Sequence, residues 1–367
     1  MKKRLRAIFL MHSIDGFAGS LIGIFIPIYL LTLGYSVKQV FIFYIITYAA
    51  LTGFFFLAGY CASRWGLKRT ILLRFPCLLF YLVALYYLPT KALPLSLLAL
   101  VNAFNMAFYW FALHIIFTHA SEHGEIGNNV GKLFALPKLA GTFAPLLGGF
   151  MAVSFGFGFI LLLAIILYLV SAIPLLYTDE LKQAIDFNLG KAIKIFRRHP
   201  RYFVGEMFNT GTSVVESVIW PVFIYLSFKD ILSIGALGTL LGIGGILFTL
   251  FIGRSSDKTD KRFLLRLGAL LMIAVWSMRY FGQNEILFYI LTILAGFFSI
   301  LITVPFASIG YGSAKKDEDG TSEFIITREV AVNIGRVIIF SVAILMVNNI
   351  KFSFLLSGLA QIYFLFF

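Results

Sequence analysis

Long apolar stretches separated by short polar loops form the main pattern of the chain. A stretch of about 20 residues, within a range of about 17–25, is long enough to cross a bilayer as a helix. We count about twelve such stretches along the sequence. They lie at about residues 7–33, 37–60, 69–88, 93–118, 129–153, 155–177, 202–228, 232–253, 262–281, 285–309, 324–347 and 351–367. The pattern therefore predicts an all-α membrane protein with about twelve transmembrane helices.

The two sets of six stretches carry matching landmarks at a constant offset of 194 residues. The matching pairs are Asp15 and Asn209, Pro27 and Pro221, Gly59 and Gly253, Arg64 and Lys258, Lys68 and Arg262, and Gly141 and Gly335. A constant register over several separate regions indicates two copies of one unit. We therefore predict a first six-helix bundle at 1–177, a linker at 178–201 and a second bundle at 202–367. The linker mixes basic and apolar residues in the way of an amphipathic helix on a membrane surface.

Lys and Arg gather in the loops on one predicted side of the membrane. That side carries the N-terminal KKRLR, the loops after Gly59 and Gly253, the linker, and Lys315 with Lys316. The other side has at most one cation per loop, namely Lys38, Lys91, Lys229, Arg279 and Lys351. Because cytoplasmic loops carry the excess of Lys and Arg, we expect the first side and the N-terminus to be cytoplasmic. Both units then begin inside, which makes them parallel repeats.

The composition agrees with a lipid environment. Of 367 residues, 60% are hydrophobic and 13% are charged, and the mean hydropathy is +0.93. Soluble domains are closer to half apolar and a quarter charged. The net charge of +13 comes from the loop cations, so it predicts an orientation in the membrane rather than a nucleic-acid partner. We expect a multi-pass protein of the cytoplasmic membrane that contacts lipid.

The basic loop that begins at Gly59 has a recognisable form. Six plus six helices, a basic central linker and a G-x-x-x-D-R-x-G-R-R loop between the second and third helices resemble the major facilitator superfamily of transporters. The residues that carry the resemblance are Gly59, Ser63, Arg64, Gly66, Lys68 and Arg69 in the first copy, and Gly253, Asp257, Lys258 and Arg262 in the second. The resemblance implies a gating role for these loops, in which the acidic position helps to hold the cytoplasmic side shut. Ser63 replaces that acid in the first copy. The alternative is that these residues only set the topology.

Several charged residues stand inside predicted spans. Asp15 lies roughly 13 Å along the first helix beyond Arg6, at about 1.5 Å per residue. An acid at such depth costs about 2.5–3.5 kcal/mol on insertion scales, so it should face a cavity or a cation. Asn209 holds the same place in the second copy, on a helix that also carries Glu206 and Glu216.

The resemblance implies partners for these charges, because the family fold places helices 1 and 5 side by side, and likewise helices 7 and 11. We therefore expect Asp15 to face Lys138, and Arg336 to face Glu206 or Glu216. Such contacts could belong to a substrate or ion pathway. The alternative is that they are static ion pairs that hold each bundle together.

Asn102 and Asn105 lie three residues apart in the fourth span, a turn before Tyr109 and Trp110. In the family, helices 1, 4, 7 and 10 line the substrate path, so this polar pair is a candidate substrate contact. Asn also serves as a hydrogen-bonding link between membrane helices, which is the competing interpretation. The tenth span is almost wholly apolar, so we expect a substrate that is not highly charged.

One stretch imitates a metal site. His119, Glu122 and His123 match the H-x-x-E-H pattern of zinc peptidases. That chemistry also needs a third ligand and an open position on the metal, and the motif runs at once into Gly124 and Gly127 at a helix end. We expect no metal and no cofactor.

We interpret the chain as a secondary active transporter that moves a small-molecule substrate across the cytoplasmic membrane by alternating access, and not as an enzyme. Protons are one option for the coupling ion, with Asp15, Glu206 or Glu216 as the carrier. Two alternatives stay open. One is a non-transporting membrane sensor or lipid-handling protein on the same scaffold, which the fold alone does not exclude. The other is a metal-dependent membrane enzyme.

Overall fold

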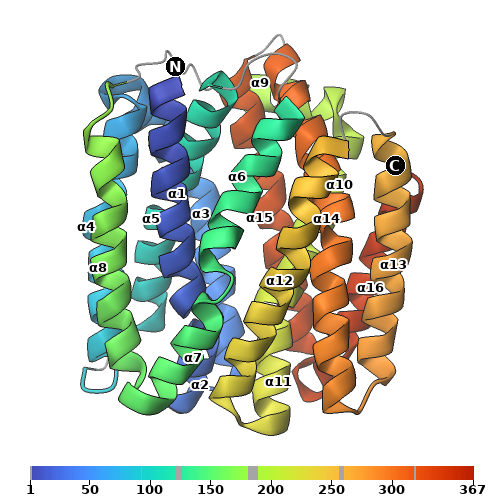
Figure 1. The fold of residues 1–367 in the computed structure, drawn as a ribbon. Helices are drawn as coiled ribbons and strands as arrows, with labels where there is room; N and C mark the ends of the chain where they lie inside the picture. Colours follow the sequence, from blue (N-terminus) through green and yellow to red (C-terminus); the bar gives the residue numbers. More distant parts are fainter. Residues whose placement is uncertain (1, 92, 121–125, 181–188, 256–259, 318–319) are drawn as a thin grey trace.

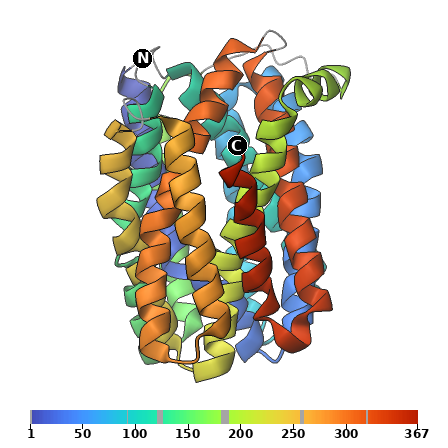
Figure 2. The same cartoon turned by 90° about the vertical axis from the view of Figure 1, so that its right-hand side faces the viewer.

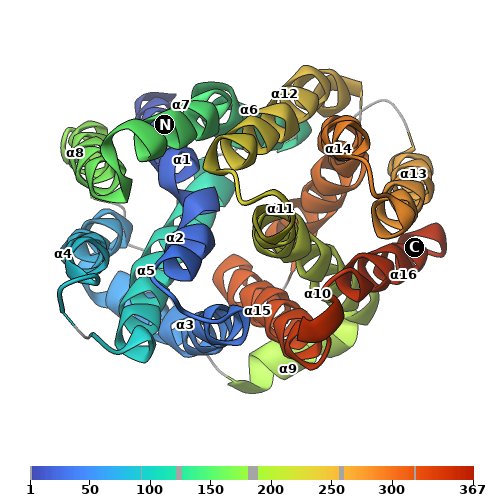
Figure 3. The same ribbon diagram turned by 90° about the horizontal axis from the view of Figure 1, so that it is seen from below.

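The computed structural model describes residues 2–91, 93–120, 126–180, 189–255, 260–317 and 320–367, and all regular secondary structure within them is helical. Most helices run along a common axis (Figure 1). We call the face where α1 (Lys2–Ile22) begins the upper face, and the opposite one the lower face. Seen from below, α1–α8 form one group and α10–α16 form a second group beside it (Figure 3). We call these groups the first half and the second half.

The first half contains six helical passages between the two faces. They are α1 with a 3₁₀ turn (Gly23–Phe25) and α2 (Ile26–Thr32); α3 (Val37–Trp65); α4 (Leu67–Tyr87); α5 (Leu95–Ala120); α6 (Ile126–Gly141) with α7 (Ala144–Phe155); and α8 (Phe157–Leu176). Helix α9 (Leu189–Arg198) follows within the predicted linker, and projects sideways at the upper face (Figure 2).

The second half repeats this arrangement. Its passages are α10 (Pro200–Val214) with a π-helical turn (Val215–Ile219) and α11 (Trp220–Phe228); α12 (Ile231–Ser255); α13 (Lys261–Phe281); α14 (Glu285–Lys316); α15 (Thr321–Leu345); and α16 (Phe352–Leu365), which follows a 3₁₀ turn (Val347–Asn349). Within the described ranges, nine helices are long and apolar enough to cross a membrane, and two shorter apolar helices lie in α12 and α16. Helix α15 is not among them, because charged residues interrupt its apolar sequence. The predicted fold, about twelve transmembrane helices in two parallel six-helix repeats, is confirmed; the exact domain bounds stay a prediction.

The matching prolines mark the same bend in both halves. Pro27 and Pro221 stand in the first turns of α2 and α11. Proline has no N–H to donate, and its ring clashes with the carbonyl four residues earlier. The helix therefore changes to a 3₁₀ turn just before α2 and to a π turn just before α11.

The matching glycines allow the fifth passage of each half to approach the first. A Cβ at Gly141 would overlap Ser20 of α1, and a Cβ at Gly335 would overlap the carbonyl oxygen of Met207 in α10. Helix α6 accordingly packs on α1, and α15 packs on α10. The expected adjacency of helices 1 and 5, and of 7 and 11, is confirmed.

Large apolar side chains also cover the outer faces of both halves. Phe150 and Val153 on α7 and Ile166 on α8 in the first half, and Phe263 and Leu270 on α13 in the second half, are each more than half exposed. Patches of this kind are costly in water, and acyl chains would cover them. The outer faces therefore fit a lipid environment.

Candidate functional site

Two cavities lie inside the bundle, and together they span the boundary between the halves. The first, of about 500 Å³, is lined by residues of α1, α2 and the turn between them, and of α4, α5, α6 and α8. The second, of about 410 Å³, is lined by residues of α6, α10, α12, α13, α14 and α16, among others. Ser20 and Lys138 line both. Each volume falls within the range of about 300–1,000 Å³ that small-molecule pockets occupy.

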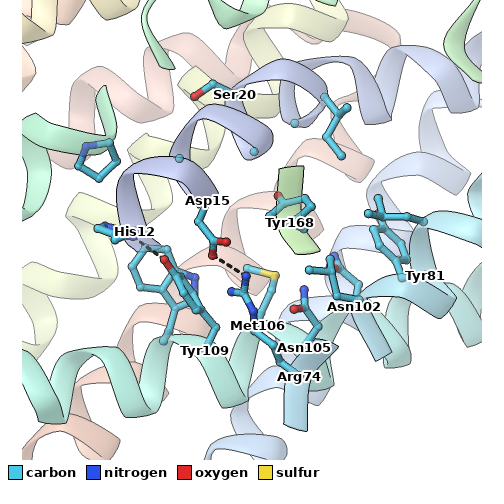
Figure 4. A pocket seen from close by; sticks show the side chains of 18 of the residues that line it. His12, Asp15, Ser20, Arg74, Tyr81, Asn102, Asn105, Met106, Tyr109 and Tyr168 are labelled. Carbon is cyan, nitrogen blue, oxygen red and sulfur yellow. Dashed lines mark hydrogen bonds and ion pairs between the residues drawn. The ribbon is translucent and has the colours of Figure 1, made fainter. Parts of the chain in front are cut away.

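Asp15 points into the first cavity, where it meets Arg74 of α4 (Figure 4). Arg74 Nη2 donates to Asp15 Oδ2 over 2.5 Å, and Ser171 Oγ donates to Asp15 Oδ1 over 2.5 Å. The guanidinium lies 4.0 Å from the centroid of the Tyr109 ring, where its charge gains a cation–π contact. Arg74 and Asp15 are only 3% and 6% exposed. The first cavity therefore has a buried ion pair in its wall, although Arg74 Nε has no hydrogen-bond partner among the described residues.

The expectation that Asp15 faces Lys138 is wrong. The third passage brings Arg74 within reach of α1 instead. Lys138 stands beside the break between α6 and α7, and its ammonium extends toward Gly245 of α12. Sequence reasoning missed Arg74, although one signal was present: an Arg inside the apolar run ILLRFPCLLF, where an unpartnered charge is expensive.

The second half has an ion pair between the same two passages. Glu216, in the π turn, accepts from Arg279 of α13 at both oxygens, over 2.5 and 2.9 Å. The guanidinium of Arg279 lies 4.1 Å from the Trp220 ring centroid and is fully buried. The assignment of Arg279 to the outer loops is therefore wrong. In each half, an acid of the first passage holds an Arg of the third.

A third group of charges connects the halves near the upper face. Glu206 Oε1 accepts from Arg328 Nε over 2.6 Å, and Arg328 Nη1 donates to Glu329 Oε1 over 2.5 Å. Glu329 Oε1 also lies 3.5 Å from Nε2 of His114, which belongs to α5 of the first half. His114 Nδ1 lies 2.6 Å from the hydroxyl of Tyr311 in α14. These side chains link α5 of the first half to α14 and α15 of the second.

The expectation that Arg336 faces Glu206 or Glu216 is wrong. Both α10 and α15 start at the upper face, so Arg328 is level with Glu206, whereas Arg336 lies two turns deeper. Arg336 Nη1 instead donates to Asn333 Oδ1 over 3.2 Å, and its guanidinium lies 4.8 Å from the Tyr48 ring centroid.

The predicted asparagines line the cavities. Asn102 and Asn105 line the first (Figure 4), and Asn209 lines the second. Asn105 Oδ1 is buried and has no hydrogen-bond partner within the described residues. An unpaired buried acceptor is costly, so a donor from a solute would be favourable there. Substrate contact by these residues stays a prediction.

The first basic loop is tied to the sixth passage of its own half. Glu180, just past α8, accepts from the backbone N–H groups of Lys68 (2.8 Å) and Arg69 (3.2 Å) at the start of α4. Lys68 Nζ donates to the carbonyl of Thr178 over 2.6 Å. Glu180 thus brings a carboxylate to the loop in which Ser63 replaces the expected acid. A carboxylate is stabilised at a helix N-terminus by the unpaired N–H groups and the helix dipole.

The other residues of the predicted gating loops do not share one set of contacts. Gly59 is buried in α3, where a Cβ would contact Ile326 of α15, and Gly66 has a φ of +91° between α3 and α4. Arg64 is exposed, 4.8 Å from the Tyr60 ring centroid. At the second loop, Gly253 lies in the last turn of α12. The backbone N–H of Arg262, at the start of α13, donates to the Asp260 side chain over 3.0 Å. Asp257 and Lys258 lie outside the described residues, and so do Glu122 and His123 of the H-x-x-E-H stretch.

Residues 8–338 match the Major Facilitator Superfamily. The chain belongs to this superfamily. It is thus a multi-pass membrane transporter of the Major Facilitator Superfamily, as the loop motif and the repeat predicted.

The chain is also similar to individual proteins. The Bacillus subtilis (strain 168) "Uncharacterized protein YqgE" is 24% identical over 314 residues, which cover 81% of this chain and 72% of YqgE. The human organic anion transporter MFSD10 (TETRAN) is similar in structure, with a TM-score of 0.70 at 12% identity over 100% of this chain and 98% of MFSD10. FucP in the outward conformation gives a TM-score of 0.72 at 12% identity over 99% and 97% of the two chains. Identities this low show a shared fold only.

Proposed function

We propose that this protein is a secondary active transporter that moves a small solute across the cytoplasmic membrane by alternating access, with its N-terminus in the cytoplasm. The observation that carries the proposal is the pair of cavities that meet at Ser20 and Lys138 on the boundary between the halves. A site on the boundary of two repeats becomes accessible from one side or the other when the halves rock. The turn between α3 and α4 and helix α9 are both rich in Lys and Arg and lie at the upper face, which supports a cytoplasmic upper face.

Contacts between the halves occur both above and below the cavities, and they differ in chemistry. Above, His114 contacts Glu329 and Tyr311. Below, the Phe340 ring of α15 stacks on Tyr44 of α3, with 5.2 Å between the ring centroids. Separation of the upper set with the lower set kept would expose the cavities to one side, and the reverse separation would expose them to the other. These two sets of contacts are the alternating gates that we propose.

We further propose that protons drive transport and that Glu329 is their acceptor. Asp15, Glu206 and Glu216 each hold an Arg within their own half, whereas Glu329 also faces the opposite half. The charged and titratable groups around it are Arg328 and Arg336 on α15, His114 on α5, Tyr311 on α14, and Glu206 and Tyr202 on α10. A proton on Glu329 would cancel its charge and weaken its attraction to Arg328 and His114. Proton binding would thus favour separation of the upper contacts.

Names of relatives carry no solute over to this chain. MFSD10 is an organic anion transporter and FucP a fucose:proton symporter, at 12% and 13% identity. Both names are compatible with transport by alternating access on this fold.

Flux measurements in proteoliposomes test the proposal. We expect at least one solute from a panel of organic acids, amides and sugars to show uptake into wild-type proteoliposomes that follows an imposed pH gradient. One pH unit can support about tenfold accumulation if one proton moves with each solute. In Glu329→Gln, exchange of the solute should persist while accumulation driven by the pH gradient is lost. The matched control is Glu285→Gln, which removes an exposed acid at the lower end of α14.

Three outcomes would count against the proposal in different ways. No flux of any panel member would contradict transport. Flux that ignores the pH gradient in the wild type would remove protons from the mechanism. If Glu329→Gln accumulates the solute along the pH gradient as well as the wild type does, proton coupling would persist, and an acid other than Glu329 would be the proton acceptor.

A further inference from the structure

Lys138 lies at the point where the two cavities meet. It directly follows Pro137 in α6, close to the break between α6 and α7. A Cβ added at Gly245 of α12 would lie 3.3 Å from Lys138 Nζ. The ammonium therefore reaches from the first half to the second, and a glycine leaves room for it there.

The ammonium of Lys138 has no acidic partner among the described side chains, in contrast to the other charges of the cavities. Asp15 is held by Arg74, and Glu216 is held by Arg279. His12 is hydrogen-bonded to the Tyr109 side chain and is counted as neutral, the form that an ordinary imidazole mostly takes at neutral pH. The charged lining residues are Asp15, Arg74, Lys138 and Glu216. With Arg279, which holds Glu216 from outside the lining, the sum is one positive charge, and Lys138 carries it.

An uncompensated ammonium at this depth needs a physical reason. A Lys at the centre of a membrane helix costs about 2.5–3.5 kcal/mol on insertion scales. Internal ion pairs offset that cost for the charges around Asp15 and Glu216, but not for Lys138. An anion that enters the cavity from water would supply the missing partner and form a charge-assisted hydrogen bond with the ammonium. The hydroxyl of Ser20, which lines both cavities, offers a second donor to such an anion.

Apart from the charges already described, the rest of the lining is mostly apolar, and its polar side chains, among them Asn209, Ser213 and Gln361, carry no charge. Met106 and Trp110 line the first cavity, and Leu241, Trp276 and Ile302 line the second. The residues that α14 contributes to the second cavity are uncharged. A dianion would therefore place its second charge against apolar or neutral groups, which is unfavourable in a low-dielectric site.

We propose that the solute is an organic monoanion, with an apolar body and an acidic group such as a carboxylate that binds the Lys138 ammonium. The proposal rests on the proposed transport function and gives its substrate class. The solute bridges the halves, because its acidic group is bound at the point where Lys138 passes Gly245.

Matched probes separate this proposal from its alternatives. The probes are benzoate and hexanoate, their neutral isosteres benzamide and hexanamide, the cation benzylamine and the dianion phthalate. The measurement is the thermal unfolding midpoint of the purified full-length protein at neutral pH, since a ligand stabilises the state that it binds. We expect benzoate or hexanoate to raise the midpoint, and the amides, the amine and the dianion to raise it less or not at all.

Three variants test whether Lys138 is the cause. Loss of one charge-assisted hydrogen bond should weaken carboxylate binding by about 10- to 100-fold in Lys138→Met. Lys138→Arg keeps the charge and should retain the preference for carboxylates over amides. Lys132→Met removes an exposed cation of the same helix that does not line either cavity, and it should behave as the wild type.

The outcomes distinguish the monoanion from the transport function. Equal effects of acids and amides in the wild type, no effect of either acid, or a preference for carboxylates that survives in Lys138→Met would each overturn the monoanion. The wild-type comparison holds even if Lys138→Met does not fold. Proteoliposome flux of an amide, with no preference for carboxylates, would support transport and contradict the proposal that the solute is a monoanion. Carboxylate binding at Lys138 without any flux would support the anion site and contradict the proposed transport function.

Discussion

At the scale of single residues, Arg74 and Arg279 are each held between a carboxylate and an aromatic ring. Arg74 lies between Asp15 and Tyr109, and Arg279 lies between Glu216 and Trp220. Removal of two charges from water costs several kcal/mol per ion, and a close pair repays this only with good geometry and further contacts. The aromatic faces and the short hydrogen bonds supply such contacts. Each half is thus pinned across its first and third passages.

The Asp15–Arg74 pair can be tested by a double-mutant cycle. Arg74→Met leaves the Asp15 carboxylate buried and unpaired, so we expect a loss of about 3–5 kcal/mol in the free energy of unfolding. Asp15→Asn should be costly in the same way. The double variant should be less destabilised than the sum of the two single changes, because it leaves no uncompensated charge. Chemical or thermal unfolding in one detergent measures all four proteins, and additive losses would contradict a direct pair.

The sequence showed that buried charges need partners, but not which partners they have. Asp15, Glu206 and Glu216 were found because they interrupt apolar runs. Their partners depend on the depth of each side chain and the tilt of each helix, which spacing within one helix does not define. Arg328 and Arg336 lie on the same helix, and only the shared start of α10 and α15 at the upper face makes Arg328 level with Glu206.

At the scale of elements, small residues set how closely the helices pack. The Gly335 backbone touches Met207 of α10 so closely that a Cβ there would overlap a backbone carbonyl. Across the boundary between the halves, Gly235 of α12 lies against Pro145 of α7 in the same way. Close backbone approach is a main source of helix association within lipid. Substitution of these glycines should therefore lower the free energy of unfolding, although helix propensity alone favours Ala over Gly.

Gly335→Ala tests this packing. Ala favours a helix over Gly by about 1 kcal/mol, so a neutral site would gain stability. At Gly335, overlap with the Met207 carbonyl should reverse that sign and cost about 1–3 kcal/mol, because a backbone atom yields less readily than a side chain. Gly312→Ala on α14 is the matched control, since nothing lies within 4 Å of its added Cβ. Thermal unfolding compares the two variants, and equal shifts would argue against a packing role for Gly335.

The sequence repeat predicted the bends and close helix contacts within each half well, but it predicted the contacts between the halves poorly. The offset of 194 residues gave the equivalence of Pro27 with Pro221 and of Gly141 with Gly335, because each pair performs the same local task in its own half. Contacts between halves, such as His114 with Glu329, have no counterpart in that register. They are set by how two bundles dock, so no periodicity within one bundle encodes them.

At the scale of the whole molecule, orientation in the membrane decides which gate faces the cytoplasm. Lys194 of α9 lies at the upper face, and Lys91 lies in the loop after α4 at the lower face (Figure 1). Both side chains are exposed. The charge bias of the loops assigns the upper face to the cytoplasm. If that assignment holds, the contact between His114 and Glu329 is the cytoplasmic gate, and a proton that loosens Glu329 acts on that side.

Cysteine labelling in intact cells tests the orientation. In a background with Cys61→Ala and Cys77→Ala, the two native thiols are absent. A membrane-impermeant maleimide should label Lys91→Cys in intact cells, and it should label Lys194→Cys only after permeabilisation. Labelling of Lys194→Cys in intact cells, with Lys91→Cys protected, would show that the orientation is the reverse of the one assigned. The gate at Phe340 would then face the cytoplasm. Labelling of both from the same side would contradict the odd number of membrane passages that separates them, and with it the two-bundle arrangement on which alternating access depends.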